Sequence, residues 1–128
     1  MKHHNSMQTP LAKVRGLGSA KSGLHHWWHQ RLTAIAMVPL MCAVVLVIAS
    51  IGTLDYDGAL ALMGNPFAAT LILLLVLVGF YHAAMGLQVV LEDYVAAEGL
   101  RMGLIIFVKM SLFALAALAV LSILKVAL

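Results

Sequence analysis

The sequence contains few of the residues on which soluble domains and most enzymes depend. Only 10% of its 128 residues are charged, and Cys42 is the single cysteine. One thiol excludes an internal disulfide and provides no cysteine pair for zinc or an iron–sulfur cluster. Because Cys42 lies inside an apolar run, we interpret it as a small packing residue. The sequence also lacks a glycine-rich phosphate loop, a GxSxG elbow and an HExxH motif, so the chain alone is not expected to be a complete enzyme.

Apolar residues dominate the composition. They make up 63% of the chain, and the mean hydropathy is +1.02. A soluble domain of this size exposes most of its residues and needs more charge to stay dissolved. The net charge of +3 does not come from a basic stripe on a polar domain, so nucleic acid is not an expected partner. The composition predicts an all-α membrane protein whose solvent is lipid.

Three apolar runs follow a polar, basic N-terminal segment, residues 1–30, in which the glycines and serines between positions 16 and 23 suggest a loose stretch. They cover about 32–52, 67–91 and 102–124 within a predicted transmembrane domain, 31–128. Each run reaches the ~20 residues that a helix needs to span the hydrocarbon core. Pro39 is expected in the first turns of the first span, where neighbouring groups can satisfy the carbonyl that it frees. The connections between the spans are predicted to be short.

The basic residues indicate how the spans are oriented. Residues 1–30 contain no acid, and positive residues accumulate on the cytoplasmic side of a membrane. The N-terminus is therefore predicted inside, the loop with Asp55 outside and the loop with Asp93 inside. Trp27 and Trp28 match an interfacial aromatic belt. We expect the bacterial inner membrane, with the mitochondrial inner membrane as the alternative. The bases that precede or open the first span are Lys2, Lys13, Lys21, Arg15 and Arg31.

His82 is the residue that says most about function. It lies about ten residues from the cytoplasmic end of the second span, roughly 15 Å deep, where ionisable residues are usually functional. A neutral imidazole is a common axial ligand of haem iron, whereas the simpler interpretation is a hydrogen bond that joins two helices. Gly79 and Gly86 lie on the same helical stripe and would leave room for a flat macrocycle or for close helix packing. We favour haem.

Asp93 and Tyr94 are candidate quinone residues. Asp93 follows His82 by eleven residues, about three turns, so both lie on one helical face about 16 Å apart. A tyrosine hydroxyl can donate a hydrogen bond to a quinone carbonyl, and a carboxylate beside it can pass protons. Aspartate and tyrosine are also common where a span meets the interface, and the spacing alone favours that simpler interpretation.

Other polar residues near the membrane surface have several possible roles. Arg31 could pair with a haem propionate, although a charge that sets the orientation is the interpretation the sequence favours. His25 and His29, at i and i+4, could share a helical face and hold a metal. We interpret His25, His26 and His29 as surface histidines, one of them assisting propionates or protons. Lys109, in the third span, is assigned no role.

Two segments resemble the small hydrophobic membrane anchor of succinate dehydrogenase. Residues 82–95 (HAAMGLQVVLEDYV) resemble its H-x10-D-Y signature. Residues 23–34 (GLHHWWHQRLTA) are similar to its segment entering the first span, which ends in R-x-T. The motifs occur in the correct order, and with the three-span layout the resemblance covers nearly the whole chain.

The resemblance implies a site shared between subunits. In that family a second three-helix anchor, the cytochrome b subunit, pairs with this one, and haem b lies between them. Each anchor supplies one axial histidine, which would be His82 as a ligand of the haem iron. Tyr94 and Asp93 match the ubiquinone site, and Arg31 and His25 match positions near the haem propionates or the quinone entrance. A flavoprotein subunit and an iron–sulfur subunit would dock on the cytoplasmic side and bring electrons from succinate.

We therefore expect half of a heterodimeric helix bundle that anchors succinate:quinone oxidoreductase and is not catalytic alone. One alternative is the anchor of a quinol:fumarate reductase. Another is a small non-redox membrane protein for transport or assembly, in which His82 and Asp93 would relay protons.

Overall fold

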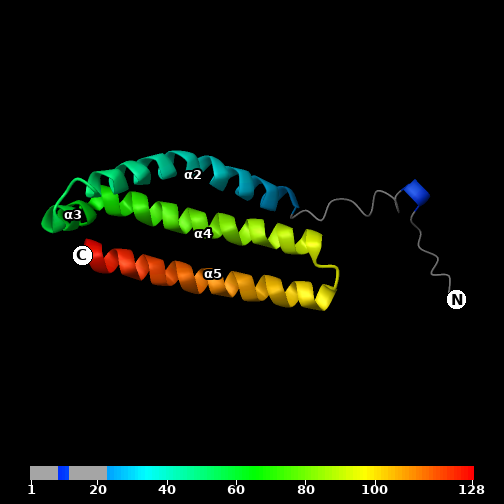
Figure 1. The fold of residues 1–128 in the computed structure, drawn as a ribbon. Helices are drawn as coiled ribbons and strands as arrows, with labels where there is room; N and C mark the ends of the chain where they lie inside the picture. Colours follow the sequence, from blue (N-terminus) through cyan, green and yellow to red (C-terminus); the bar gives the residue numbers. More distant parts are fainter. Residues whose placement is uncertain (1–8, 12–22) are drawn as a thin grey trace.

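From Gly23 onward the chain is a set of helices. The computed structural model describes residues 9–11 and 23–128, so most of the predicted basic segment, with Lys2, Lys13, Arg15 and Lys21, lies outside the described residues. No strand occurs in the part of the chain that the structure describes, and the predicted all-α membrane fold is confirmed. The helices are α2 (Gly23–Ile51), α3 (Tyr56–Met63), α4 (Pro66–Tyr94) and α5 (Glu98–Ala127) (Figure 1).

Three of these helices are long and apolar enough to cross a membrane. Helices α2 and α4 contain 29 residues each and α5 contains 30. At 1.5 Å per residue this is about 44 Å, more than the ~30 Å hydrocarbon core. Each helix therefore extends beyond its predicted apolar run. Residues 23–30, assigned to the basic N-terminal segment, form the beginning of α2. Hydropathy marks where lipid begins and not where backbone hydrogen bonding begins.

Pro39 lies in the interior of α2 and not in its first turns. The prediction was wrong because it took the helix to begin with the apolar run. Proline lacks the N–H that would bond to the carbonyl four residues earlier, and its ring crowds that carbonyl. Such a position bends a helix, and α2 is visibly curved in Figure 1.

The connection between α2 and α4 contains the eight-residue helix α3, where only a short connection was predicted. Asp55 caps its N-terminus by accepting a hydrogen bond from the Gly58 N–H at 2.9 Å. Asn65 caps α4 in the same way and accepts from the Phe67 N–H at 2.9 Å. These caps satisfy N–H groups that have no partner within the helix, so each helix can begin within a short connection.

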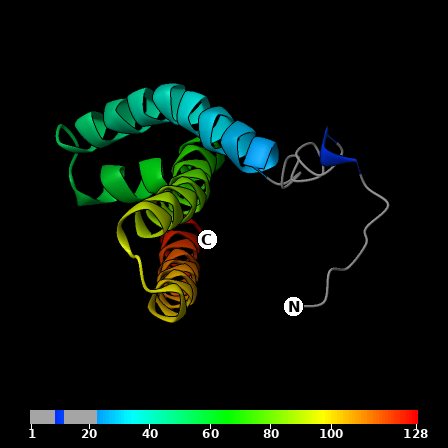
Figure 2. The ribbon, with the colours of Figure 1, turned by 90° about the vertical axis from the view of Figure 1, so that its right-hand side faces the viewer.

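Helix α4 is the centre of the arrangement. Helices α2 and α5 each pack along α4, and within residues 23–128 no Cα atom of α2 lies within 8 Å of a Cα atom of α5. Figure 2 shows them on either side of α4. Helix α3 contacts all three long helices at the end of the bundle where α2 finishes (Figure 1).

The described residues bury little apolar surface. Val44, Ala68, Ala69 and Met85 are the buried hydrophobic side chains among them, and nothing in the most apolar part of α5 is buried. Cys42, predicted to be a packing residue, is exposed on this chain. Exposed apolar surface of this extent is available for lipid or for another protein.

Candidate functional site

His82 faces α2 across the seam between α2 and α4. Its side chain is half-buried, and its Nδ1 lies 2.9 Å from the hydroxyl oxygen of Thr33. Its Nε2 lies 3.4 Å from the amide nitrogen of Gln30, a distance at the long limit for a hydrogen bond. The imidazole therefore joins two helices, as in the simpler of the two interpretations, but its contact with Thr33 is much shorter than its contact with Gln30.

The two glycines near His82 have different surroundings. A Cβ at Gly86 would lie 3.3 Å from the Gln30 amide nitrogen, so this glycine lets α2 and α4 approach closely. A Cβ at Gly79 would meet no atom within 4 Å. Of the two predicted uses, close packing applies to Gly86, whereas Gly79 leaves open space one turn from His82.

Asp93 and Tyr94 are the last two residues of α4. Both are exposed, Tyr94 by 85%. They lie at the end of the bundle where α2 begins and α4 meets α5 (Figure 1), the end that also carries His25 and Arg31. Asp93 and Tyr94 therefore lie at one end of the bundle, and His82 lies about three turns further along α4. Among the described residues no hydrogen bond joins either of them to His82.

Arg31 and His25 make contacts along α2. The Arg31 guanidinium lies 4.5 Å from the centre of a Trp27 ring, a cation–π distance. The His25 and His29 rings are 4.3 Å apart between centres, so the predicted shared face of these two histidines is confirmed. Within the described residues no three His, Cys, Asp or Glu side chains form a metal-binding group.

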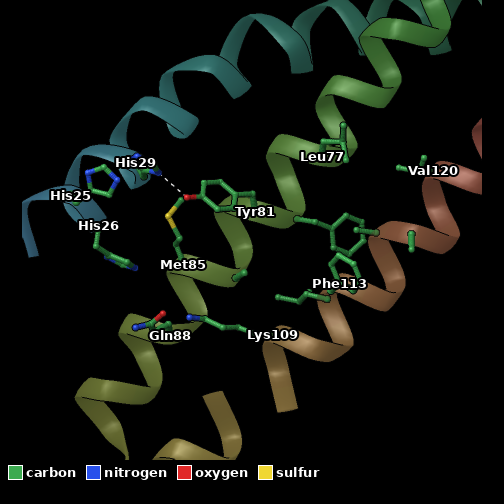
Figure 3. A pocket seen from close by; sticks show the side chains of 15 residues that line it. His25, His26, His29, Leu77, Tyr81, Met85, Gln88, Lys109, Phe113 and Val120 are labelled. Carbon is green, nitrogen blue, oxygen red and sulfur yellow. Dashed lines mark hydrogen bonds between the residues drawn. The ribbon is translucent and has the colours of Figure 1, made fainter. Parts of the chain in front are cut away.

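A groove of about 770 Å³ lies between α2 and α5, over α4. His29 Nδ1 and the Tyr81 hydroxyl form a 2.7 Å hydrogen bond on its wall, and Lys109 points toward Gln88 from α5 (Figure 3). The His26 Nε2 atom is buried without a hydrogen-bond partner. The groove has polar groups at one end and apolar walls beyond. Lys109, to which no role was assigned from the sequence, and Tyr81 both line it.

Thr33 and Gln30 are the other residues whose contacts sequence reasoning missed. Both lie in the segment 23–34, and Thr33 is the threonine of its R-x-T motif. A signal was therefore present, but the motif does not say which residue of α4 lies opposite. That pairing depends on how α2 and α4 pack.

Known proteins are similar in sequence to most of this chain. The sequence model of the succinate dehydrogenase/fumarate reductase transmembrane subunits matches residues 5–123. The chain is 38% identical over 102 residues to the succinate dehydrogenase hydrophobic membrane anchor subunit of Rickettsia bellii, covering 78% of this chain and 80% of that protein. It is 35% identical over 99 residues to the subunit of the same name from Paracoccus denitrificans, covering 77% and 76%.

A more distant relative has a related name. The succinate dehydrogenase membrane anchor subunit of Reclinomonas americana is 28% identical over 92 residues, 70% of this chain and 77% of that protein. No solved structure matches the chain significantly. The resemblance predicted from residues 23–34 and 82–95 is confirmed: the chain belongs to the family of succinate dehydrogenase/fumarate reductase transmembrane subunits.

Proposed function

We propose that this chain is the membrane anchor subunit of a succinate dehydrogenase, and that it holds part of a haem b site and part of a ubiquinone site. The observation that carries the proposal is the half-buried imidazole of His82 at the seam of two apolar helices. The family match supports the anchor role. Its sites would be completed by the cytochrome b subunit, and electrons would come from the iron–sulfur and flavoprotein subunits.

The surroundings of His82 fit a haem ligand. A metal-ligating histidine almost always donates its other ring N–H to a neighbouring acceptor, and Thr33 stands in that position at Nδ1. The Nε2 atom has only the long contact to Gln30, and open space lies at Gly79. When bound, haem would supply a one-electron carrier beside the quinone; His82 would hold the iron from this chain, and the partner subunit would supply the second ligand.

The end of α4 fits a quinone site that another subunit completes. Tyr94 is exposed and its hydroxyl can donate a hydrogen bond to a quinone carbonyl, and the Asp93 carboxylate can pass protons. The contribution of this chain is positioning. Arg31 and His25, at the same end of the bundle, would face the haem propionates or the quinone entrance.

The proposed location is the bacterial inner membrane with the N-terminus in the cytoplasm. The relatives from Rickettsia and Paracoccus support a bacterial membrane, and the acid-free basic segment 1–30 supports the orientation. The soluble subunits would then dock at the end of the bundle that carries Asp93 and Tyr94. The mitochondrial inner membrane is the alternative.

A second candidate is the anchor of a quinol:fumarate reductase. The family description names fumarate reductase together with succinate dehydrogenase. The same residues would then release electrons from a quinol instead of delivering them to a quinone. Identification of the quinone that copurifies with the complex distinguishes the two, because a low-potential quinone favours fumarate reduction.

A visible spectrum of the intact complex, purified in mild detergent, tests the haem site. We expect b-type haem bands after dithionite reduction in the wild type, and loss of these bands in His82→Ala. His4→Ala is the control, since it removes a histidine to which no haem role is assigned and should retain the bands. A wild-type complex without haem bands, or a His82→Ala complex with full bands, would exclude His82 as a haem ligand.

A further inference from the structure

The hydroxyl group of Thr33 lies between the backbone of α2 and the ring of His82. Its oxygen is 2.7 Å from the His29 carbonyl oxygen and 3.1 Å from the Gln30 carbonyl oxygen. It is also 2.9 Å from His82 Nδ1. A hydroxyl has one proton to donate and two lone pairs that accept, so these three contacts determine the position of each proton.

Carbonyl oxygens only accept hydrogen bonds, so the Thr33 proton must point to the carbonyls of α2. If the proton pointed to His82 instead, two oxygen atoms 2.7 Å apart would face each other with no proton between them. Thr33 is therefore the acceptor in its contact with His82, and His82 Nδ1 carries the donated proton. In a neutral imidazole the other nitrogen, Nε2, then keeps its lone pair.

The group facing that lone pair is weakly held. The Gln30 amide nitrogen lies 3.4 Å from His82 Nε2, and the Gln30 amide oxygen is buried without a partner. A long contact on one side and an unsatisfied acceptor on the other contribute little to holding this side chain. Gln30 can therefore move away from Nε2 at a low cost, whereas Thr33 is held by its bonds to the α2 backbone.

We propose that Thr33 is a positioning residue for His82: it fixes the proton on Nδ1, orients the ring and leaves Nε2 as the atom that binds iron, with Gln30 moving aside. This role rests on the proposed function, in which His82 is a haem ligand. An acceptor at Nδ1–H strengthens the electron donation of the other ring nitrogen to a bound metal. Greater electron donation stabilises oxidised iron, so Thr33 is expected to lower the reduction potential of the haem and to slow its loss.

The test compares Thr33→Val and Thr33→Ser in the intact complex. Valine keeps the shape of threonine without the hydroxyl, whereas serine keeps the hydroxyl. We expect Thr33→Val to raise the haem midpoint potential and to accelerate haem transfer to excess apomyoglobin by about 10- to 100-fold, the usual effect of losing such a partner on metal affinity. Thr33→Ser should resemble the wild type in both measurements.

Thr70→Val is the matched control. The Thr70 hydroxyl donates to the Pro66 carbonyl at 2.7 Å, so this variant loses a similar backbone bond but no histidine partner. A purely structural role for Thr33 would lower the melting temperature of the Thr33→Val complex while leaving the haem potential unchanged, and that result would overturn the proposal. A wild-type complex without haem would instead refute the proposed function.

If Thr33→Val does not assemble, the wild type itself provides the test. With ¹⁵N-labelled histidine and the haem iron reduced to its diamagnetic low-spin state, NMR of the complex should find iron at His82 Nε2 and a hydrogen-bonded proton on Nδ1. A ligated Nδ1, or an Nδ1 proton with no hydrogen-bond shift, would contradict the positioning role.

Discussion

Replacement of Gly79 by leucine should have opposite effects on the stability of this chain and on haem binding by the assembled complex. A Cβ at position 79 meets no atom of this chain within 4 Å, so the substitution creates no clash at that atom. Leucine is also the better helix former, by about 0.5–1 kcal/mol. The chain alone should therefore be as stable as the wild type or slightly more stable.

The assembled site should respond in the opposite direction. Position 79 lies about 4.5 Å along the helix axis from His82, on the same stripe. A leucine side chain there would occupy space that a macrocycle bound at His82 requires. We expect Gly79→Leu to fold and insert normally but to lose most of its haem.

The assay is haem per complex by pyridine haemochrome, together with the melting temperature of the purified complex. Gly103→Leu in α5 is the matched control, because a Cβ there also meets nothing within 4 Å and the gain in helix propensity is the same. A Gly79→Leu complex with full haem content would show that the open space at Gly79 is not used. Equal haem loss in both variants would mean that added bulk disturbs assembly in general.

Two further predictions concern the ends of α4 and α3. Tyr94→Phe should lower quinone reduction roughly 2- to 13-fold, equivalent to a lost hydrogen bond of about 0.5–1.5 kcal/mol. Succinate oxidation measured with an artificial dye should persist. Equal loss of both activities would indicate failed assembly. Asp55→Ala should destabilise the complex by about 0.5–2 kcal/mol, because α3 loses the cap on the Gly58 N–H. Thermal unfolding checks this against Asp57→Ala, which removes an acid from the same helix but not the cap and should cost less.

The helices of this chain bury few side chains among themselves. Within residues 23–128 the backbones of α2 and α5 stay more than 8 Å apart between Cα atoms, and few of the described side chains are buried. A chain with so little core of its own depends on lipid and on partner subunits for much of its packing. We therefore expect stability, and the haem content that we propose, to depend on assembly.

The number of long helices followed directly from the sequence, whereas their ends did not. Apolar runs report which residues tolerate lipid, so they predicted three spans but missed the polar start of α2 at Gly23. The same error moved Pro39 from the interior of α2 to its beginning. Helix α3 was missed because its eight residues are too few for a clear period, although Asp55 has the residue type of an N-cap.

The sequence alone determined that the chain is a three-span membrane protein of this family, because hydropathy and motif spacing are local properties. They can be recognised without knowing how the helices pack. His82 was identifiable for the same reason: its depth in an apolar span is a matter of counting residues. Only the tertiary structure decided that His82 faces Thr33 and Gln30, that Gly86 packs closely while Gly79 does not, and that Lys109 shares a groove with Tyr81. Those contacts depend on how separate helices are rotated and placed against each other. Because the apolar faces of the helices resemble one another, the sequence is compatible with many such arrangements.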